Sequence, residues 1–105
     1  MKNVRRAAES LSEPWKPIVL ADVNGFQMKV AKLLGEFPWH AHEQEDELFY
    51  CFVGSFRIEQ IGAPSVTLTA GDVFVVPAGR RHRSVAHDAA VAVVFEQAET
   101  KQYGG

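Results

Sequence analysis

The sequence predicts a small all-β domain, built as a sandwich or a barrel. Short apolar or alternating runs recur between residues 18 and 95, and turns rich in glycine, proline and asparagine separate them. No amphipathic helical pattern follows residue 12. The chain has 105 residues, of which 47% are apolar, so it is long enough for one buried core and too short for two domains.

The first sixteen residues are expected to form an arm outside this domain. Apolar residues near helical spacing predict a short helix over residues 3–11, with a loose arm as the alternative. Pro14 and Pro17 would stop such a helix, because proline lacks the backbone N–H. Trp15 is expected to pack on the domain, so that the arm closes one of its ends.

From residue 17 the pattern is β throughout. Asn24-Gly25 is a strong hairpin signal, because both residues tolerate the left-handed conformation of a tight turn. We therefore expect a domain over residues 17–97 and a C-terminal tail over residues 98–105. The expected strands cover residues 18–21, 26–31, 48–53, 56–60, 66–69, 73–76, 84–85 and 90–95.

The run from Leu48 to Val53 is apolar at every position, so both faces of this strand should be covered. If Glu47 points into the domain, strand alternation directs Phe49, Cys51 and Val53 inward as well. The intervening side chains then face a second sheet or a partner subunit; they are Leu48, Tyr50 and Phe52. We expect a homodimer, because so small a domain gains stability by covering an outer apolar face.

The composition argues against several classes of protein. Charged residues make up 23% of the chain and the net charge is -2, which indicates no nucleic-acid or membrane surface. No secretory signal is recognisable at the N-terminus, and no run approaches the ~18 apolar residues of a membrane span. A single cysteine, Cys51, excludes an intrachain disulfide. We expect a cytoplasmic protein whose partner is a small molecule.

The histidines follow a pattern typical of a metal site. On a strand, His40 and His42 would leave the same face, with Cα atoms about 6.6 Å apart. Glu47 follows after a short polar loop, and His82 lies on a later strand. Three imidazoles and a carboxylate suit one divalent transition metal (Fe, Mn, Ni, Co, Cu or Zn) better than calcium, which prefers oxygen ligands. The alternative is that these histidines bind no metal. Because three of the chain's four histidines fall at these positions, the metal site is favoured.

A first spaced motif surrounds the histidine pair. It reads Gly35, four residues, His40-x-His42, four residues, Glu47, six residues and Gly54. A second motif follows in the right order, and its residues are Gly71, five residues, Pro77-x-Gly79, two residues and His82.

Together the two motifs resemble those of the cupin superfamily of small jelly-roll barrels. The resemblance implies a single cupin double-stranded β-helix, with a metal at the bottom of its cavity. The ligands that it implies are His40, His42, Glu47 and His82. Two positions depart from the family pattern. The stretch after Gly35 is one residue short, and Ala86 stands where the family often has asparagine, which is not a ligand.

Three further residues are candidate ligand-binding residues. Phe49 and Cys51 share the inward direction of Glu47, and Arg80 shares that of His82. Arg80 could anchor a carboxylate or phosphate, with a solvated turn as the alternative. Cys51 could be an extra metal ligand or a redox-active thiol, with an inert buried cysteine as the alternative.

Two functions fit these residues. The first is a metal-dependent enzyme acting on a small oxygen-rich substrate. Dioxygenase or lyase chemistry is slightly favoured over isomerase chemistry, because the sequence reveals no second acid or base beside Glu47. The second is a non-catalytic small-ligand-binding or sensor module using the same metal; the sequence has no helix-turn-helix pattern and no basic stripe, which disfavours a DNA-binding regulator. A third possibility is a barrel that serves chiefly in assembly.

Overall fold

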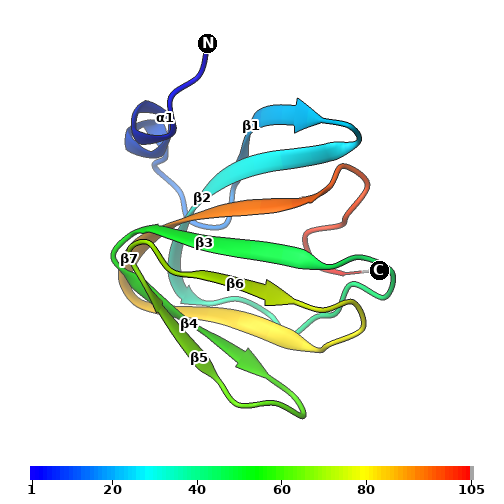
Figure 1. The fold of residues 1–105 in the computed structure, drawn as a ribbon. Coiled ribbons are helices and arrows are strands. Elements are labelled where there is room, and N and C mark those ends of the chain that lie inside the picture. Colours follow the sequence, from blue (N-terminus) through cyan, green and yellow to red (C-terminus); the bar gives the residue numbers. More distant parts are fainter. Residues whose placement is uncertain (105) are drawn as a thin grey trace.

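The computed structural model describes residues 1–104, and this part of the chain folds into one short helix and seven strands (Figure 1). Within these residues no helix is long and apolar enough to cross a membrane. The elements are α1 (Val4–Ser10), β1 (Ile18–Val23), β2 (Phe26–Glu36), β3 (Glu47–Val53), β4 (Ser55–Gln60), β5 (Val66–Thr69), β6 (Val73–Val76) and β7 (His82–Gln97).

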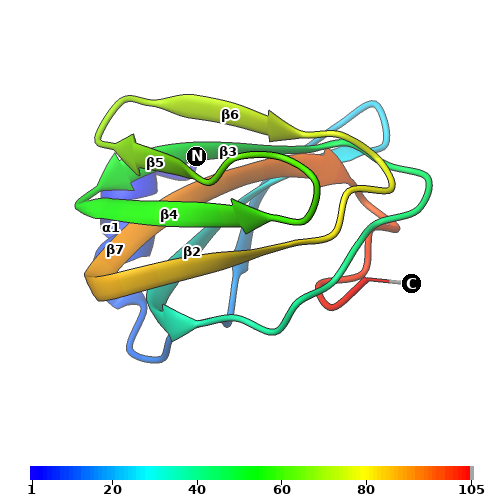
Figure 2. The ribbon, with the colours of Figure 1, turned by 90° about the horizontal axis from the view of Figure 1, so that it is seen from below.

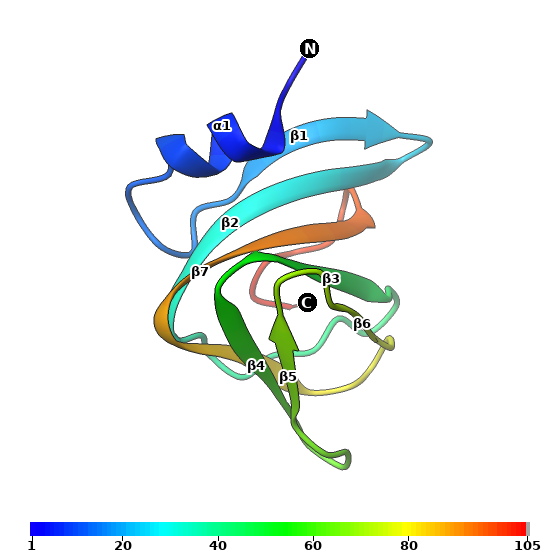
Figure 3. The same ribbon diagram turned by 60° about the vertical axis from the view of Figure 1, so that its left-hand side comes forward.

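The fold is the predicted all-β barrel with a short N-terminal helix. All seven strands belong to one hydrogen-bonded sheet. Five of them are ordered β1-β2-β7-β3-β6, and β4 pairs with both β5 and β7. Figures 2 and 3 show the strands wrapping around a common interior. Asn24 and Gly25 both have positive φ angles, 49° and 81°, which makes the β1–β2 connection the expected tight hairpin.

Strand β7 holds the barrel together. It pairs with β2 along most of its length, with β4 near its start and with β3 near its end. The sequence predicts two short strands here, 84–85 and 90–95, whereas the structure has one 16-residue strand. The pairing of β2 with β7 is irregular at one place: Leu33 pairs with Ala90 and Gly35 with Ala86, so the extra residues lie on β7.

The interior of the barrel is a single apolar core. Its members come from β2, β3, β4, β5, β6 and β7, and three of them, Cys51, Ile58 and Ala92, have no exposed surface. The remaining core residues are Ala31, Leu33, Phe49, Phe56, Leu68, Val76, Ala86 and Ala90.

Helix α1 covers part of the outer face of the sheet (Figure 3). The Asn3 side chain accepts a hydrogen bond from Arg6 N at 3.1 Å, which caps the helix. The apolar residues of α1 pack beside Tyr50 and Phe52 against a small outer cluster. The buried members of that cluster are Leu20, Val30 and Val93.

Alternation along β3 is as predicted up to Cys51. Glu47, Phe49 and Cys51 are buried, and Tyr50 and Phe52 face the outer cluster. The expectation that Val53 points inward is wrong, because its side chain is 50% exposed. A register shift against β7 between Cys51 and Val53 breaks the alternation just before Gly54.

Candidate metal centre

Four buried side chains meet inside the barrel. One potential ligand atom from each lies within 4.8 Å of those of the others. The four residues are His40, His42, Glu47 and His82. The structure thus brings together all four residues singled out from the sequence, and three nitrogens and one carboxylate oxygen could hold a divalent transition metal.

His40 and His42 lie in the segment between β2 and β3, outside the regular strands. An isolated bridge holds His40 to the start of β7, with hydrogen bonds His40 N to His82 O at 3.0 Å and His82 N to His40 O at 2.8 Å. Gly79 N donates to His42 O at 2.8 Å. Backbone hydrogen bonds therefore hold the segments that carry the three imidazoles next to one another.

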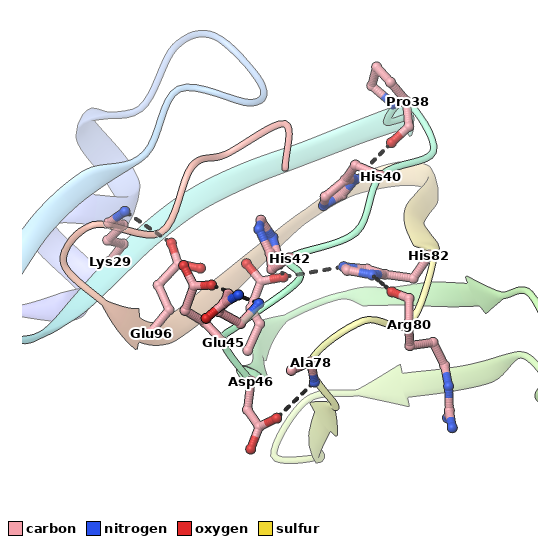
Figure 4. A network of polar contacts seen from close by, with 12 residues as sticks. Lys29, Pro38, His40, His42, Glu45, Asp46, Ala78, Arg80, His82 and Glu96 are labelled. Atoms are coloured by element: carbon pink, nitrogen blue, oxygen red, sulfur yellow. Dashed lines mark hydrogen bonds and ion pairs between the residues drawn. The ribbon is translucent and has the colours of Figure 1, made fainter. Parts of the chain in front are cut away.

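Two imidazoles are oriented by backbone carbonyls (Figure 4). His40 Nδ1 lies 2.9 Å from Pro38 O, and His82 Nδ1 lies 2.9 Å from Arg80 O. A carbonyl oxygen only accepts, so each Nδ1 carries the hydrogen. In the neutral rings this leaves Nε2 as a lone-pair donor, which is the arrangement typical of histidines that bind metals.

The Glu47 carboxylate lies between the rings of His42 and His82. Its Oε1 is 3.3 Å from His42 Nε2 and 3.3 Å from His82 Nε2. His42 Nε2 is buried and has no aligned hydrogen-bond partner among the described residues. A neutral His82 with its hydrogen on Nδ1 has none to give Glu47. These lone pairs, which face one another in a buried space, fit a metal ion.

The titration behaviour of the cluster is consistent with such a site. Burial lowers the pKa of His40, which keeps this ring neutral. The neighbouring Glu47 carboxylate raises the pKa of His42 against the effect of burial. Burial opposes ionisation of Glu47, but the facing His42 and His82 outweigh it and lower the pKa of that carboxyl. Glu47 is therefore an anion at neutral pH.

A cavity of about 70 Å³ adjoins the cluster. Both chain termini help to enclose it. Trp15 Nε1 donates to Leu34 O at 3.1 Å, and Gln102 Nε2 donates to Trp15 O at 2.8 Å. Phe37 packs between the rings of Trp15 and Tyr103, each 4.9 Å away between centroids. The packing of Trp15 is as expected, whereas no motif in the sequence indicated a role for the tail.

A second buried carboxyl, Glu96, lies in the cavity wall and is absent from the sequence predictions. Lys29 Nζ donates to Glu96 Oε1 at 3.0 Å (Figure 4). Burial, followed by the nearby Glu47 carboxylate, raises the pKa of Glu96 to about 7. One signal could have revealed it: Ala90, Ala92 and Glu96 share a strand face, and Glu96 lies one residue beyond the predicted strand.

The three candidate ligand-binding residues have different surroundings. Phe49 lines the cavity. The thiol of Cys51 is buried in the core 3.3 Å from Gly54 O, and burial raises its pKa. Arg80 donates from Nη1 to Gln60 Oε1 at 3.2 Å, and its side chain points away from the histidines (Figure 4). Among the described residues, the cavity wall contains neither Cys51 nor Arg80.

Comparison with known proteins identifies the family. The model of the cupin domain matches residues 27–96. The chain belongs to the cupin family. This cupin is 30% identical over 102 residues to "Uncharacterized protein YdbB" of Bacillus subtilis (strain 168), an alignment that covers 95% of this chain and 90% of the relative.

Solved structures of other proteins have the same architecture. A cupin-2 domain containing protein from Shewanella frigidimarina is 31% identical, with a TM-score of 0.87 over 91% of this chain and 93% of the other. Hydroquinone 1,2-dioxygenase from Sphingomonas sp. TTNP3 shares the fold at 19% identity, with a TM-score of 0.84 over 92% of this chain and 32% of the dioxygenase chain.

The Lys29–Glu96 pair is expected to be important for stability. Lys29→Met leaves the Glu96 carboxylate buried without its cation, which should lower the free energy of unfolding by about 3 kcal/mol. Lys16→Met is the matched control, because Lys16 pairs with Glu13 in solvent and its loss should change stability little. Urea unfolding followed by circular dichroism measures both. Equal effects of the two substitutions would contradict a buried, structural ion pair.

Proposed function

We propose that this cupin is a metal-dependent enzyme acting on a small, oxygen-containing substrate. One divalent transition metal would be held by His40, His42, Glu47 and His82. The observation that carries the proposal is the orientation of the donor atoms: two rings have their Nδ1–H groups on carbonyls, and a buried His42 Nε2 has no hydrogen-bond partner among the described residues.

The chain's own residues have separable tasks in this proposal. The bridge between His40 and His82 sets the spacing of the rings, and Glu47 contributes the negative charge. Apolar walls from Trp15 and Phe49 limit the access of water to the cavity. When bound, a transition metal supplies Lewis-acid or redox chemistry at coordination positions that the protein leaves open.

A second carboxyl group in the cavity bears on the class of reaction. The sequence favours dioxygenase or lyase chemistry slightly over isomerase chemistry because it reveals no second acid or base beside Glu47. Glu96 is such a second carboxyl group, buried next to Glu47 in the same cavity. That reason for ranking isomerases lower therefore no longer holds. Oxygen consumption separates a dioxygenase from the other two classes, and the identity of the product separates a lyase from an isomerase.

The ligand set can be tested by metal content. His82→Ala removes a fully buried imidazole from the cluster and should sharply reduce the metal that copurifies with the protein. His87→Ala is the matched control, because His87 is exposed and outside the cluster. Elemental analysis gives the metal content, and circular dichroism checks that both variants remain folded and β-rich. Unchanged metal content in folded His82→Ala would contradict the assignment.

Turnover separates an enzyme from a ligand-binding module. Metal-loaded protein should convert at least one member of a panel of dicarbonyls, thiols and sugar acids, and the metal-free protein should not. An oxygen electrode and product analysis by mass spectrometry, run side by side, distinguish dioxygenase from lyase or isomerase chemistry. Tight binding of a panel member without turnover would instead support a sensor module using the same metal.

We also propose that the protein is a homodimer through the outer sheet face that α1 leaves uncovered. Four side chains there are between 37% and 57% exposed; they lie on β2, β7 and β6, and Leu48 of the intervening β3 pairs with a residue on each of its two neighbours, β7 and β6. They are Phe26, Val73, Val75 and Phe95. The solution mass at micromolar concentration should be twice 11.6 kDa, and Val75→Asp should shift it toward the monomer. A monomeric wild-type protein would contradict this.

A further inference from the structure

The tail formed by residues 98–104 turns back toward the barrel after β7 (Figures 1 and 3). Its residue Gln102 forms part of the cavity wall, together with Trp15 and His40. We propose that this tail is a lid, which opens to let a small molecule reach the cavity and then closes over it. The inference rests on the proposed function, because it concerns access to the same cavity.

Trp15 and Phe37 form the fixed edge against which the lid closes. Trp15 N donates to Lys32 O at 2.9 Å and Trp15 Nε1 donates to Leu34 O at 3.1 Å, so two hydrogen bonds join this residue to β2. The buried ring of Phe37 lies 4.9 Å from the ring of Trp15 and 5.2 Å from that of His40, between centroids. A segment that covers this edge therefore also covers the side of the cluster on which His40 lies.

The backbone of the lid is held to the barrel only at its start. Ala98 N donates to Gly25 O at 2.8 Å, which fixes the first residue of the lid. Further along, the backbone hydrogen bonds that the structure describes for residues 99–104 close local turns. They are Thr100 N to Gln97 O and Gly104 N to Lys101 O, both 3.0 Å long.

Two side chains of the lid contact the fixed edge. Gln102 Nε2 donates to Trp15 O at 2.8 Å, and the ring of Tyr103 stacks on Phe37. Tyr103 nevertheless remains 62% exposed. Segments with few buried contacts open locally at a small cost in free energy, and this property is common among lids over binding sites.

Thr100 makes the closed position less stable. Its side chain is 6% exposed, and its Oγ1 has no hydrogen-bond partner among the described residues. A buried hydroxyl group without a partner is costly, and water satisfies it when the lid opens. Thr100 is not part of the cavity wall, so its cost acts on the lid and not on the surface that a ligand would touch.

Gly104 shows how closely the lid approaches the metal cluster. Its φ is 88°, a conformation that other residues rarely adopt. A Cβ atom at this position would collide with the backbone oxygen of Ala41, which lies between His40 and His42 in the sequence. A larger residue than glycine would therefore push the lid away from the segment that carries these two histidines.

Two substitutions should move the lid in opposite directions without removing an atom from the cavity wall. Gly104→Ala should favour the open lid, because its methyl group collides with Ala41 O. Thr100→Val should favour the closed lid, because it removes the unpartnered hydroxyl group and keeps the shape of the side chain. A rigid wall would respond to neither change.

Each substitution has a matched control. Gly62 also has a positive φ, 84°, but a Cβ atom there would have no neighbour within 4 Å, so Gly62→Ala reproduces the backbone cost without the collision. Thr67 is exposed on β5, so Thr67→Val makes the same chemical change as Thr100→Val away from the lid.

The reaction of His40 with diethyl pyrocarbonate, in metal-free protein, measures the opening of the lid. This reagent modifies neutral imidazole nitrogens; His40 is 8% exposed in the cavity wall, whereas His87 is exposed and serves as the internal reference. Mass spectrometry gives the rate at each histidine. The ratio of the His40 rate to the His87 rate should rise about tenfold in Gly104→Ala and fall about threefold in Thr100→Val. Both control variants should leave it unchanged.

Three results would overturn the lid. The first is an unchanged ratio in folded Gly104→Ala or Thr100→Val, and the second is an equal rise in Gly62→Ala. The third is a parallel change at His82, which is 1% exposed and outside the cavity wall, because the whole barrel would then be opening. If circular dichroism shows that Gly104→Ala does not fold, Tyr103→Ala replaces it, since it removes the stack on Phe37 and should raise the ratio likewise.

Zinc kinetics separate this proposal from the metal assignment. A lid governs entry and exit alike, so Gly104→Ala should speed both zinc uptake and zinc release to a chelator by similar factors. Faster release with unchanged uptake would mean that the tail merely stabilises the bound state, and would overturn the lid. If wild-type protein binds no zinc, the proposed metal function fails, and the reaction of His40, which needs no metal, still decides on the lid.

Discussion

The backbone bridge between His40 and His82 is the constraint on which the site depends. Its two hydrogen bonds, 3.0 and 2.8 Å long, join the segment after β2 to the first residue of β7. The same two residues carry imidazoles into the cluster, so strand pairing and ligand geometry are set by one contact. Residues far apart in the sequence become neighbours only when β7 is in place, which makes the site a product of the completed barrel.

The loops at this end of the barrel reinforce the bridge. Gly79 N donates to His42 O at 2.8 Å, and Ala78 N donates to the Asp46 side chain at 2.8 Å. These contacts tie the turn before His82 to the loop before Glu47. Gly79 has a φ of 82°, a conformation that other residues rarely adopt, which explains why glycine suits this turn. Rigid backbone support lets a cluster of buried polar groups keep one geometry.

Two carboxyls in one cavity are pushed in opposite directions by their surroundings. Glu47 faces imidazoles, which lower its pKa despite burial. Glu96 faces apolar walls and the Glu47 charge, which raise its pKa to about 7 even though Lys29 is bonded to it. Pairs of carboxyls with such divergent pKa values are common where proteins bind or transform ligands. The cavity therefore holds two carboxyls of different character next to each other, one ionised and one with a pKa close to neutral pH.

The fold and the cluster could be predicted because their signals are local. Turn residues, alternation and the two spaced motifs indicate a barrel and four candidate metal-binding residues. What the sequence could not show depends on register and packing. Val53 turns outward because of a register shift, and Arg80 reaches Gln60 because its side chain is long enough to leave the turn. The burial of Glu96 could not be predicted, because a single acidic residue at the end of a strand is usually solvated.

We propose that this barrel presents three histidines and one glutamate to a single ion. Crystals grown with a transition metal, with anomalous diffraction recorded at its absorption edge, test it most directly. We predict one strong anomalous peak bonded to three imidazole nitrogens, at about 2.0–2.1 Å for zinc, and to a Glu47 oxygen. An ion bound elsewhere, or one bonded to fewer than three of these histidines, would contradict this ligand set.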